Sequence, residues 1–325
     1  MGVEDVKRVG VVGAGTMGHG IAQVFAQAGY PVALMSRRET TLRQALEGVK
    51  LNLMRFAEHK LVQEEEIEAI LSRIESSVNL EKAMSDVDFV VEAVPEDMEA
   101  KKEVFQSLDS ICPEHAILAS NTSGLSITKI GSATRRPEKV VGTHFWNPPH
   151  IMPLVEVVKG ASTSDETFQT TFELMERAGK VPAKVLKDIP GFIGNRIQHA
   201  MWREVFSLLD KEVATAEDID KVVKLTFGAR LPIIGPLETA DLNGVDLTLK
   251  VQSYLLKYID RSTEPAEILK KMVEKGNFGI KTGKGFYTWT KEKSEKAIAR
   301  RDDKLIKLLK PYLRKQQKVH RSNSP

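Results

Sequence analysis

Residues 7–18 read KRVGVVGAGTMG, and this stretch decides the fold of the first half of the chain. An apolar run rich in β-branched residues predicts a buried strand. The run leads directly into Gly13-x-Gly15-x-x-Gly18, and apolar residues at helical spacing follow as far as Gly29. The first glycine permits a tight turn, the second lets a pyrophosphate approach the backbone, and the third lets the helix pack on the strand.

The helix that begins at the third glycine is suited to binding phosphate, because its free N–H groups and its dipole favour anions. The motif follows a strand, opens a helix and precedes a second apolar strand at 32–35. This context favours dinucleotide binding over a plain structural turn. The residues expected to contact the cofactor in this loop are Gly13, Ala14, Gly15, Thr16, Met17 and Gly18.

Three residues after the second strand bear on the choice between NAD and NADP. Rossmann sites specific for NAD usually carry Asp or Glu here, where it accepts a hydrogen bond from the ribose 2′-hydroxyl. In this chain Ser36 takes that place, and Arg37 and Arg38 follow. Two guanidinium groups are typical of a site for a 2′-phosphate, so the sequence favours NADP(H). The alternative is that both arginines are solvated loop charges.

Length and composition limit the classes of protein. The 325 residues suggest about two domains, and 42% hydrophobic with 28% charged residues is typical of a globular protein with a sizeable core. No apolar run approaches the roughly 20 residues that a membrane span requires, and no signal or transit peptide is predicted. The single cysteine, Cys112, excludes an internal disulfide and suits a reducing compartment. We therefore expect a cytoplasmic protein.

The net charge of +3 conceals an asymmetry. Residues 291–325 hold 12 Lys or Arg and 4 Asp or Glu, so a tail of charge +8 follows a body of charge −5. A basic tail on an acidic body is not the pattern of a nucleic-acid-binding domain. We expect the tail to form a helix from about 294 to 318 that packs on the body or on a second subunit. Membrane-surface binding is less favoured, because the helix has no Trp or Phe anchor.

Strands and helices alternate as far as residue 188 and then the alternation stops. Asp188-Ile189-Pro190-Gly191 forms a natural hinge, and helical patterns follow at 192–213, from 215, from 236 and at 245–259. A run of helices after an α/β unit implies a second, all-α domain. We therefore predict an α/β Rossmann-type domain over 1–188, an all-α domain over 189–290 and a basic helical tail over 291–325.

A strand, a proline turn and a returning strand are predicted to place His144 beside Glu156. Alternation along the second strand puts Glu156 on one face with apolar neighbours, where an acid requires a partner. A carboxylate that holds one ring nitrogen leaves the other nitrogen free as a general base. The alternative is a purely structural pair. The other six histidines have no such partner in the sequence.

Two further segments leave alternatives open. Residues 120–124, SNTSG, follow a strand at its carboxyl end, where they contact a ligand or cap the next helix. Residues 277–287 form a glycine-rich loop that is either a tight structural loop or a lid over the cofactor. The sequence predicts no metal site.

Taken together, the motifs resemble those of the L-3-hydroxyacyl-CoA dehydrogenase family over residues 5–290. They occur in the right order as GAGTMG at 13–18, SNTS at 120–123, HFWNP at 144–148, LVEV at 154–157, PGFIGNR at 190–196 and KTGKGFY at 281–287. The resemblance implies that His144 takes the proton of a 3-hydroxyl group while hydride passes to the nicotinamide. It also implies that Glu156 orients His144, that Ser123 binds the reacting oxygen and that Asn195 helps to hold the substrate.

The resemblance extends these roles to the cofactor, the substrate and the assembly. The cofactor contacts that it implies are Glu96, Lys101, Ser123, Asn147 and Lys281. Asn52 and Lys60 fall where family members contact CoA, although this match is looser. The resemblance further implies a homodimer formed through the helical domain.

The chain also departs from the family pattern. Ser36 replaces the usual acid, and Pro153 and Gly124 replace a common Lys and Ser. The Pro153 segment and Arg300-Arg301-Asp302 resemble the gulonate and carnitine dehydrogenases and λ-crystallin, relatives that oxidise free hydroxy acids. We predict an NAD(P)-dependent dehydrogenase of a 3-hydroxyacyl-CoA. A dehydrogenase of a free 3-hydroxy acid is the first alternative, and a non-catalytic, crystallin-like structural protein is the second.

Overall fold

The computed structural model describes the backbone of residues 1–322 and the side chains of residues 1–314. The described chain separates into two compact units. The first combines Met1–Asn195 with the segment from Arg300, and the second is Arg196–Ala299. The two units follow the predicted order of an α/β and a helical domain, while the exact domain limits at 188 and 290 stay predictions.

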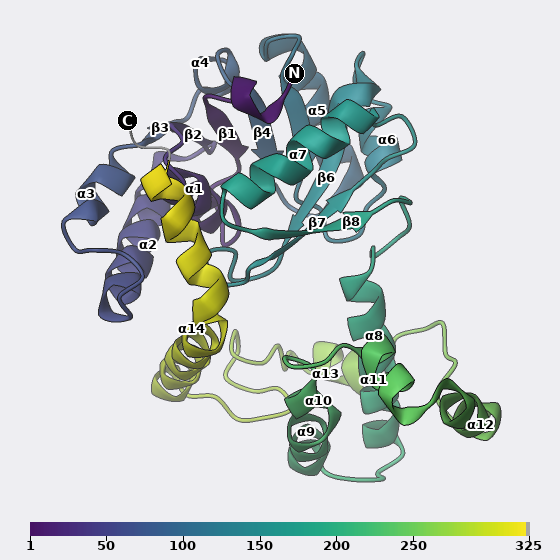
Figure 1. The fold of residues 1–325 in the computed structure, drawn as a ribbon. Coiled ribbons are helices and arrows are strands. Elements are labelled where there is room, and N and C mark those ends of the chain that lie inside the picture. Colours follow the sequence, from purple (N-terminus) through teal and green to yellow (C-terminus); the bar gives the residue numbers. More distant parts are fainter. Residues whose placement is uncertain (323–325) are drawn as a thin grey trace. The chain divides into compact units, whose positions relative to one another are not determined.

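An eight-stranded sheet with the order β3-β2-β1-β4-β5-β6-β7-β8 forms the centre of the first unit (Figure 1). Its strands are β1 (Val9–Val12), β2 (Val32–Met35), β3 (Ile74–Ser77), β4 (Phe89–Glu92), β5 (Ile117–Ser120), β6 (Val140–Phe145), β7 (Leu154–Val158) and β8 (Val181–Val185). Neighbouring strands are parallel except β6 and β7, which pair antiparallel. The strand order reverses beside β1, so the carboxyl ends of β1 and β4 form the switch point where such sheets bind ligands. The predicted Rossmann-type fold is confirmed.

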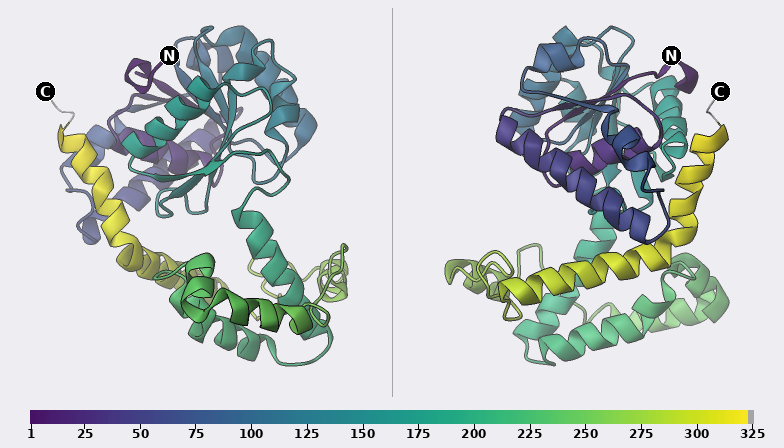
Figure 2. Two further views of the ribbon diagram at one scale, coloured as in Figure 1. Left: turned by 45° about the vertical axis from the view of Figure 1, so that its right-hand side comes forward. Right: turned by 90° about the vertical axis from the view of Figure 1, so that its left-hand side faces the viewer.

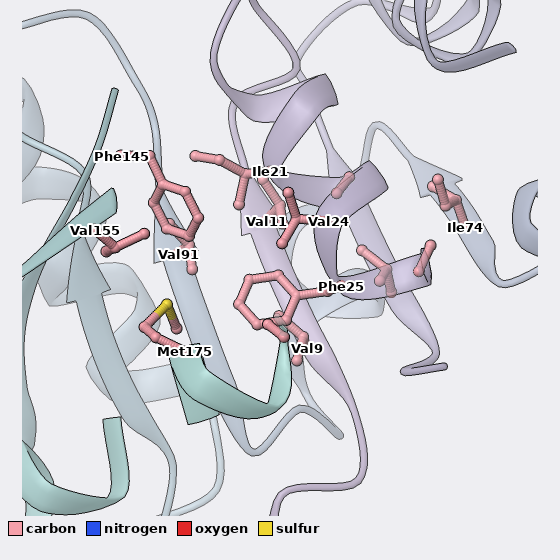
Figure 3. Close-up of a cluster of buried hydrophobic side chains, with 14 of the residues drawn as sticks. Val9, Val11, Ile21, Val24, Phe25, Ile74, Val91, Phe145, Val155 and Met175 are labelled. Atoms are coloured by element: carbon pink, nitrogen blue, oxygen red, sulfur yellow. The ribbon is translucent and has the colours of Figure 1, made fainter. Parts of the chain in front are cut away.

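Helices cover both faces of this sheet. One face carries α1 (Gly18–Gln27), α2 (Glu39–Glu58), α3 (Glu66–Leu71) and α7 (Asp165–Arg177), and the other carries α4 (Leu80–Met84), α5 (Met98–Ile111) and α6 (Ile127–Gly131). Two short 3-10 turns, η1 (Val3–Asp5) and η2 (Pro137–Lys139), complete the unit. Figure 3 shows how Phe25 of α1 packs between Val9 of β1 and Phe145 of β6, with Met175 of α7 nearby. The ring centroids of Phe25 and Phe145 lie 6.5 Å apart.

Two glycines fix the geometry of the loop between β1 and α1. Gly13 adopts a φ of +105°, a conformation that other residues rarely adopt. A Cβ atom on Gly18 would lie 1.7 Å from the carbonyl oxygen of Gly13, so only glycine lets α1 approach the strand so closely. A Cβ atom on Gly15, in contrast, would meet no atom within 4 Å. The loop is therefore closely packed at its two ends and open at its middle glycine.

The helix α14 (Lys291–Ser322) belongs to the first unit from Arg300 onward. Figures 1 and 2 show this segment, in yellow, alongside α2. Arg55 of α2 pairs with Asp302 at 2.9 Å, and the Nε2 atom of His59 lies 3.2 Å from the Asp303 carboxylate. Ile306 is buried in the core that α1 and α2 cover. The prediction that the tail packs on the body is confirmed for residues 300–314.

The second unit is helical, as predicted. It contains α8 (Gly194–Asp210) from its third residue onward, α9 (Ala216–Leu225), α10 (Phe227–Arg230), α11 (Pro236–Asn243), α12 (Val245–Leu255) and α13 (Glu267–Glu274). The helix expected over 245–259 ends four residues early. Large apolar side chains are exposed along this unit, among them Ile233, which is 86% exposed, and Leu237. Within the described part of the chain, no helix combines the length and apolarity that a membrane crossing requires.

The packing around the nucleotide loop predicts opposite effects for two glycine substitutions. Gly18→Ala forces a methyl group against a backbone oxygen, so we expect a loss of about 3 kcal/mol or more in the free energy of unfolding. Gly15→Ala adds its methyl group in open space, so we expect a change below about 1 kcal/mol. Chemical denaturation of both variants measures this difference, and equal stability of the two would contradict the packing argument.

Candidate active site

His144 and Glu156 form a buried pair at the centre of the site. The antiparallel register of β6 and β7 places the two residues directly opposite each other. The Nδ1 atom of His144 lies 2.7 Å from the Oε2 atom of Glu156, and the residues are 4% and 1% exposed. An ionised carboxylate only accepts hydrogen bonds, so Nδ1 carries the proton and Nε2 of the neutral ring is left as a base. The predicted juxtaposition of these two residues is confirmed.

The second carboxylate oxygen of Glu156 is held by the backbone at the start of α8. Its Oε1 atom accepts hydrogen bonds from the amides of Ile193, at 2.9 Å, and Gly194, at 3.0 Å. Burial alone would raise the pKa of Glu156, but the hydrogen bonds from His144 and from these two amides outweigh it. The pKa of Glu156 therefore lies below its ordinary value, and the carboxylate stays charged beside the imidazole.

Aromatic rings enclose the imidazole of His144. Its centroid lies 5.0 Å from the ring of Trp146 and 5.9 Å from that of Phe192. Phe192 has a φ of 49°, an uncommon value for a bulky residue, and its ring is buried. A Cβ atom on Gly194 would lie 2.2 Å from the Trp146 ring, so glycine is required there. The segment from Pro190 to Asn195 thus packs directly against the histidine.

Ser123 and Asn195 also meet at this site. The Nδ2 group of Asn195 donates a hydrogen bond to the carbonyl oxygen of Ser123 at 2.7 Å. The amide of Ser123 and the hydroxyl of Thr122 both donate to Oε1 of Glu96, at 2.8 and 2.6 Å. The loop that follows β5 is therefore fixed from two sides, and the side chain of Ser123 is exposed.

A buried acid that the sequence analysis missed lies behind this loop. Glu92, at the end of β4, is fully buried and accepts hydrogen bonds from Lys101 Nζ at 2.7 Å and from Ser120 Oγ at 2.6 Å. Its Oε1 atom also accepts from the amide of Val94. Lys101 lies between Glu92 and Glu96, at 2.7 and 3.4 Å. An acid at the end of an otherwise apolar strand was the signal that could have identified it.

Asn147 is exposed at the start of the loop between β6 and β7, before a cis peptide bond to Pro148. Further along this loop, His150 is buried, and its Nδ1 atom lies 3.4 Å from the side-chain nitrogen of Asn52. Burial, and then the positive charge of Lys180, lower the pKa of His150 to about 3. The ring is therefore neutral at physiological pH. Asn52 also donates to Gln23 at 3.0 Å, so its side chain connects α1 and α2.

The predicted cofactor loop lies at the carboxyl ends of β1 and β2. In the loop, Ala14 is buried, whereas Gly15 and Thr16 are exposed, and Met17 is half-buried without a side-chain cap on α1. The open space above Gly15 and the uncapped N-terminus of α1 fit a pyrophosphate. Arg37 and Arg38 are exposed after β2, and Ser36 is half-buried. The residues present therefore fit a dinucleotide.

Two further predicted contact residues, Lys60 and Lys281, are exposed. Lys60 is exposed after α2, with a φ of 56°, and Lys281 is exposed in the second unit. For the other six histidines the sequence offered no acid partner. The structure contains further pairs, because His59 lies beside Asp303 and His115 Nε2 lies 2.8 Å from Asp88. Those acids come from distant segments, so local sequence could not reveal them.

Comparison with known proteins identifies the family. A family model for the NAD-binding domain of 3-hydroxyacyl-CoA dehydrogenases matches residues 8–189, and a model for their C-terminal domain matches residues 191–289. The chain belongs to the 3-hydroxyacyl-CoA dehydrogenase family. The predicted family and the predicted class of nicotinamide-dependent oxidoreductase are thereby confirmed.

Individual relatives resemble the chain to different extents. The 3-hydroxybutyryl-CoA dehydrogenase of Clostridioides difficile is 42% identical over 285 residues, which are 87% of this chain and all of that protein. The structure of (S)-3-hydroxybutyryl-CoA dehydrogenase from Ralstonia eutropha has a TM-score of 0.74 at 36% identity and covers 88% of this chain and 100% of its own. The structure of 5-formyl-3-hydroxy-2-methylpyridine 4-carboxylic acid 5-dehydrogenase, an NAD⁺-dependent dismutase, has a TM-score of 0.89 at 30% identity. It covers 94% of this chain and 98% of its own.

Proposed function

We propose that this chain interconverts the 3-hydroxyl and 3-keto groups of a 3-hydroxyacyl-CoA, with a nicotinamide dinucleotide as the redox partner. The observation that carries the proposal is the buried hydrogen bond between His144 and Glu156, which leaves Nε2 of the ring as a base. The family membership and the relatives that act on 3-hydroxybutyryl-CoA support the same substrate class. The cytoplasmic location expected from the sequence remains part of the proposal.

The proposed chemistry follows from the protonation state of the pair. Nε2 of His144 takes the proton of the 3-hydroxyl as the C–O bond gains double-bond character. The nicotinamide, when bound, supplies the acceptor for the hydride that leaves C3. Glu156 holds Nδ1 and stabilises the positive charge that the ring acquires, because its carboxylate is ionised and buried beside it. Reduction of the 3-keto group runs through the same atoms in reverse.

The residues around the pair have supporting roles in this proposal. Ser123 would bind the reacting oxygen and Asn195, which donates to the Ser123 carbonyl, would hold the substrate beside it. Lys101, Glu96 and Asn147 would meet the cofactor in the first unit, and Lys281 is the cofactor contact proposed for the second unit. Asn52 and Lys60 would contact the CoA portion along α2.

The proposed cofactor preference is NADP(H). Arg37 and Arg38 are exposed after β2, and Ser36 replaces the acid that would accept a bond from a 2′-hydroxyl. Two guanidinium groups stabilise a 2′-phosphate by charge-assisted hydrogen bonds. The pyridine-carboxylate dehydrogenase is NAD⁺-dependent by its description, so the two cofactors require direct comparison.

A free 3-hydroxy acid is the second candidate substrate, and the tail favours it. The family match ends at residue 289, whereas a structural match over 94% of the chain reaches beyond that residue. That match is with an enzyme of a free pyridine carboxylate. In this chain Asp302 pairs with Arg55 on α2, the helix to which we assign the CoA contacts, and Asp303 lies beside His59, which follows that helix. The tail therefore occupies part of the surface at the end of α2, which favours a compact acid over a long thioester.

A substrate panel distinguishes the two candidates. Oxidation of NADPH and NADH is followed spectrophotometrically with acetoacetyl-CoA and, in parallel, with acetoacetate. We expect turnover with the thioester and a higher kcat/KM with NADPH than with NADH. Turnover with acetoacetate alone would replace the first candidate by the second, and equal kcat/KM for both cofactors would contradict the role given to Arg37 and Arg38.

Removal of the base tests the mechanism. His144→Gln retains a polar side chain but has no base, so we expect kcat to fall by about two to four orders of magnitude. Binding of NADH, measured by fluorescence titration, should change little. His115→Gln is the matched control, because His115 pairs with Asp88 at the opposite, amino end of β4. Normal turnover in His144→Gln would exclude His144 as the base.

We propose in addition that the chain forms a homodimer through its helical unit. In that unit Ile233, Leu237 and Leu242 are between 76% and 86% exposed, which is unusual for large apolar side chains on a folded helical domain. A second copy that covers them would remove this surface from water. Sedimentation equilibrium of the full chain should give twice the chain mass, and Leu237→Asp should lower that mass. A monomer at micromolar concentration would contradict the proposal.

A further inference from the structure

Lys180 is a buried cation that the proposed mechanism does not use. It lies between the end of α7 and the start of β8, and it is 4% exposed. Its ammonium donates hydrogen bonds to the carbonyl oxygens of Pro149, at 2.6 Å, and Met152, at 3.1 Å. Within the described residues, no carboxylate lies within ion-pair distance of this ammonium. Two carbonyls of one loop are therefore its polar partners here.

A lysine in this place is costly for the fold. An ammonium without a carboxylate partner loses its hydration on burial, and carbonyl dipoles replace only part of it. Burial accordingly lowers the pKa of Lys180 to about 7. An apolar side chain would avoid this cost, but it could not donate the two hydrogen bonds that the lysine makes to the loop carbonyls.

The two carbonyls belong to residues 147–153, here called the 147–153 loop. Together with Trp146 this loop joins the strand of His144 to the strand of Glu156, and Asn147 is its first residue. A further hydrogen bond links the loop to the start of β8, where the amide of Val181 donates to the carbonyl of Pro153 at 2.9 Å. Lys180 thus contacts the loop from the side of β8.

The opposite side of the same loop contacts the nucleotide-binding part of the sheet. A Cβ atom on Gly20 of α1 would lie 2.6 Å from the ring of Pro149, so the loop packs closely on α1. The ring of His150 lies 5.7 Å from that of Phe56 on α2, and 3.4 Å separates its Nδ1 atom from Asn52. The loop therefore lies between α1 and α2 on one side and Lys180 on the other.

We propose that Lys180 is a positioning residue, whose two hydrogen bonds hold the 147–153 loop against α1 so that Asn147 keeps its place beside the cofactor. The inference rests on the proposed function, because the contact between Asn147 and the cofactor belongs to that proposal. It assigns to the buried ammonium a mechanical role in cofactor binding rather than a chemical step.

The test uses three variants of the full chain. Lys180→Met removes the ammonium at similar length, and Lys180→Arg restores a cation. Lys184→Met is the matched control, because Lys184 lies four residues further on, in β8, with its charge exposed over the ring of Phe172. Hydrogen exchange reports on the loop through the amides of Ile151 and Met152, which donate to the carbonyl of Pro148 at 3.0 and 2.9 Å. Fluorescence titration gives the Kd for NADPH and NADH.

In Lys180→Met we expect exchange at these two amides to accelerate about tenfold or more, while the amides of β1 and β4 keep their rates. The Kd for the reduced cofactor should rise about tenfold. Lys180→Arg should recover part of both losses, and Lys184→Met should match the unchanged chain. Should the methionine variant not fold, Lys180→Gln, which keeps an uncharged donor on a shorter side chain, should show smaller changes in the same direction.

Three results would overturn the inference. Unchanged exchange at Ile151 and Met152 would show that Lys180 does not hold the loop. Equal acceleration throughout the sheet would assign it a role in stability alone. Faster loop exchange with an unchanged cofactor Kd would separate the loop from cofactor binding. A chain that fails on every substrate would refute the proposed function, but these readouts need no turnover and would still decide the role of Lys180.

Discussion

The hydrogen bond between His144 and Glu156 is the interaction on which the site depends. It requires two strands of opposite direction, and β6 and β7 are the antiparallel pair in an otherwise parallel sheet. It also requires that the remaining carboxylate oxygen be satisfied away from water, and the amides of Ile193 and Gly194 supply those donors. The carboxylate of Glu156 therefore connects the antiparallel strand pair to the start of the long helix α8. The same carboxylate sets the tautomer of the base.

Local pattern was sufficient to predict the parts of the site that neighbouring residues determine. The spacing of three glycines predicts the nucleotide loop, and a proline turn between two apolar strands predicts the His144–Glu156 pair. Glu92 and Lys180 were not predicted, because their partners come from separate strands, helices and loops. The acid partners of His59 and His115 lie 244 and 27 residues away. Such contacts depend on the tertiary fold, and no single stretch of sequence contains both members.

Buried charge is arranged differently on the two sides of the site. Next to β4, Lys101 is compensated by Glu92 and Glu96, so that the ion pair and its hydrogen bonds fix the end of the strand. Next to β8, Lys180 has carbonyl partners. Burial lowers the pKa of Lys180 to about 7, so the charge of this lysine responds to pH near neutrality.

The return of the chain to its first unit at Arg300 has a consequence for how the protein is made. Ile306 and Leu313 are buried in the core of that unit, although nearly the whole chain precedes them. During synthesis, the α2 surface that they cover stays open to water until residues 300–313 have left the ribosome. A ribosome that stops at the end of the helical unit would release a chain whose sheet is complete but whose apolar α2 face is bare. Full burial of the first core thus requires the segment that follows the helical unit.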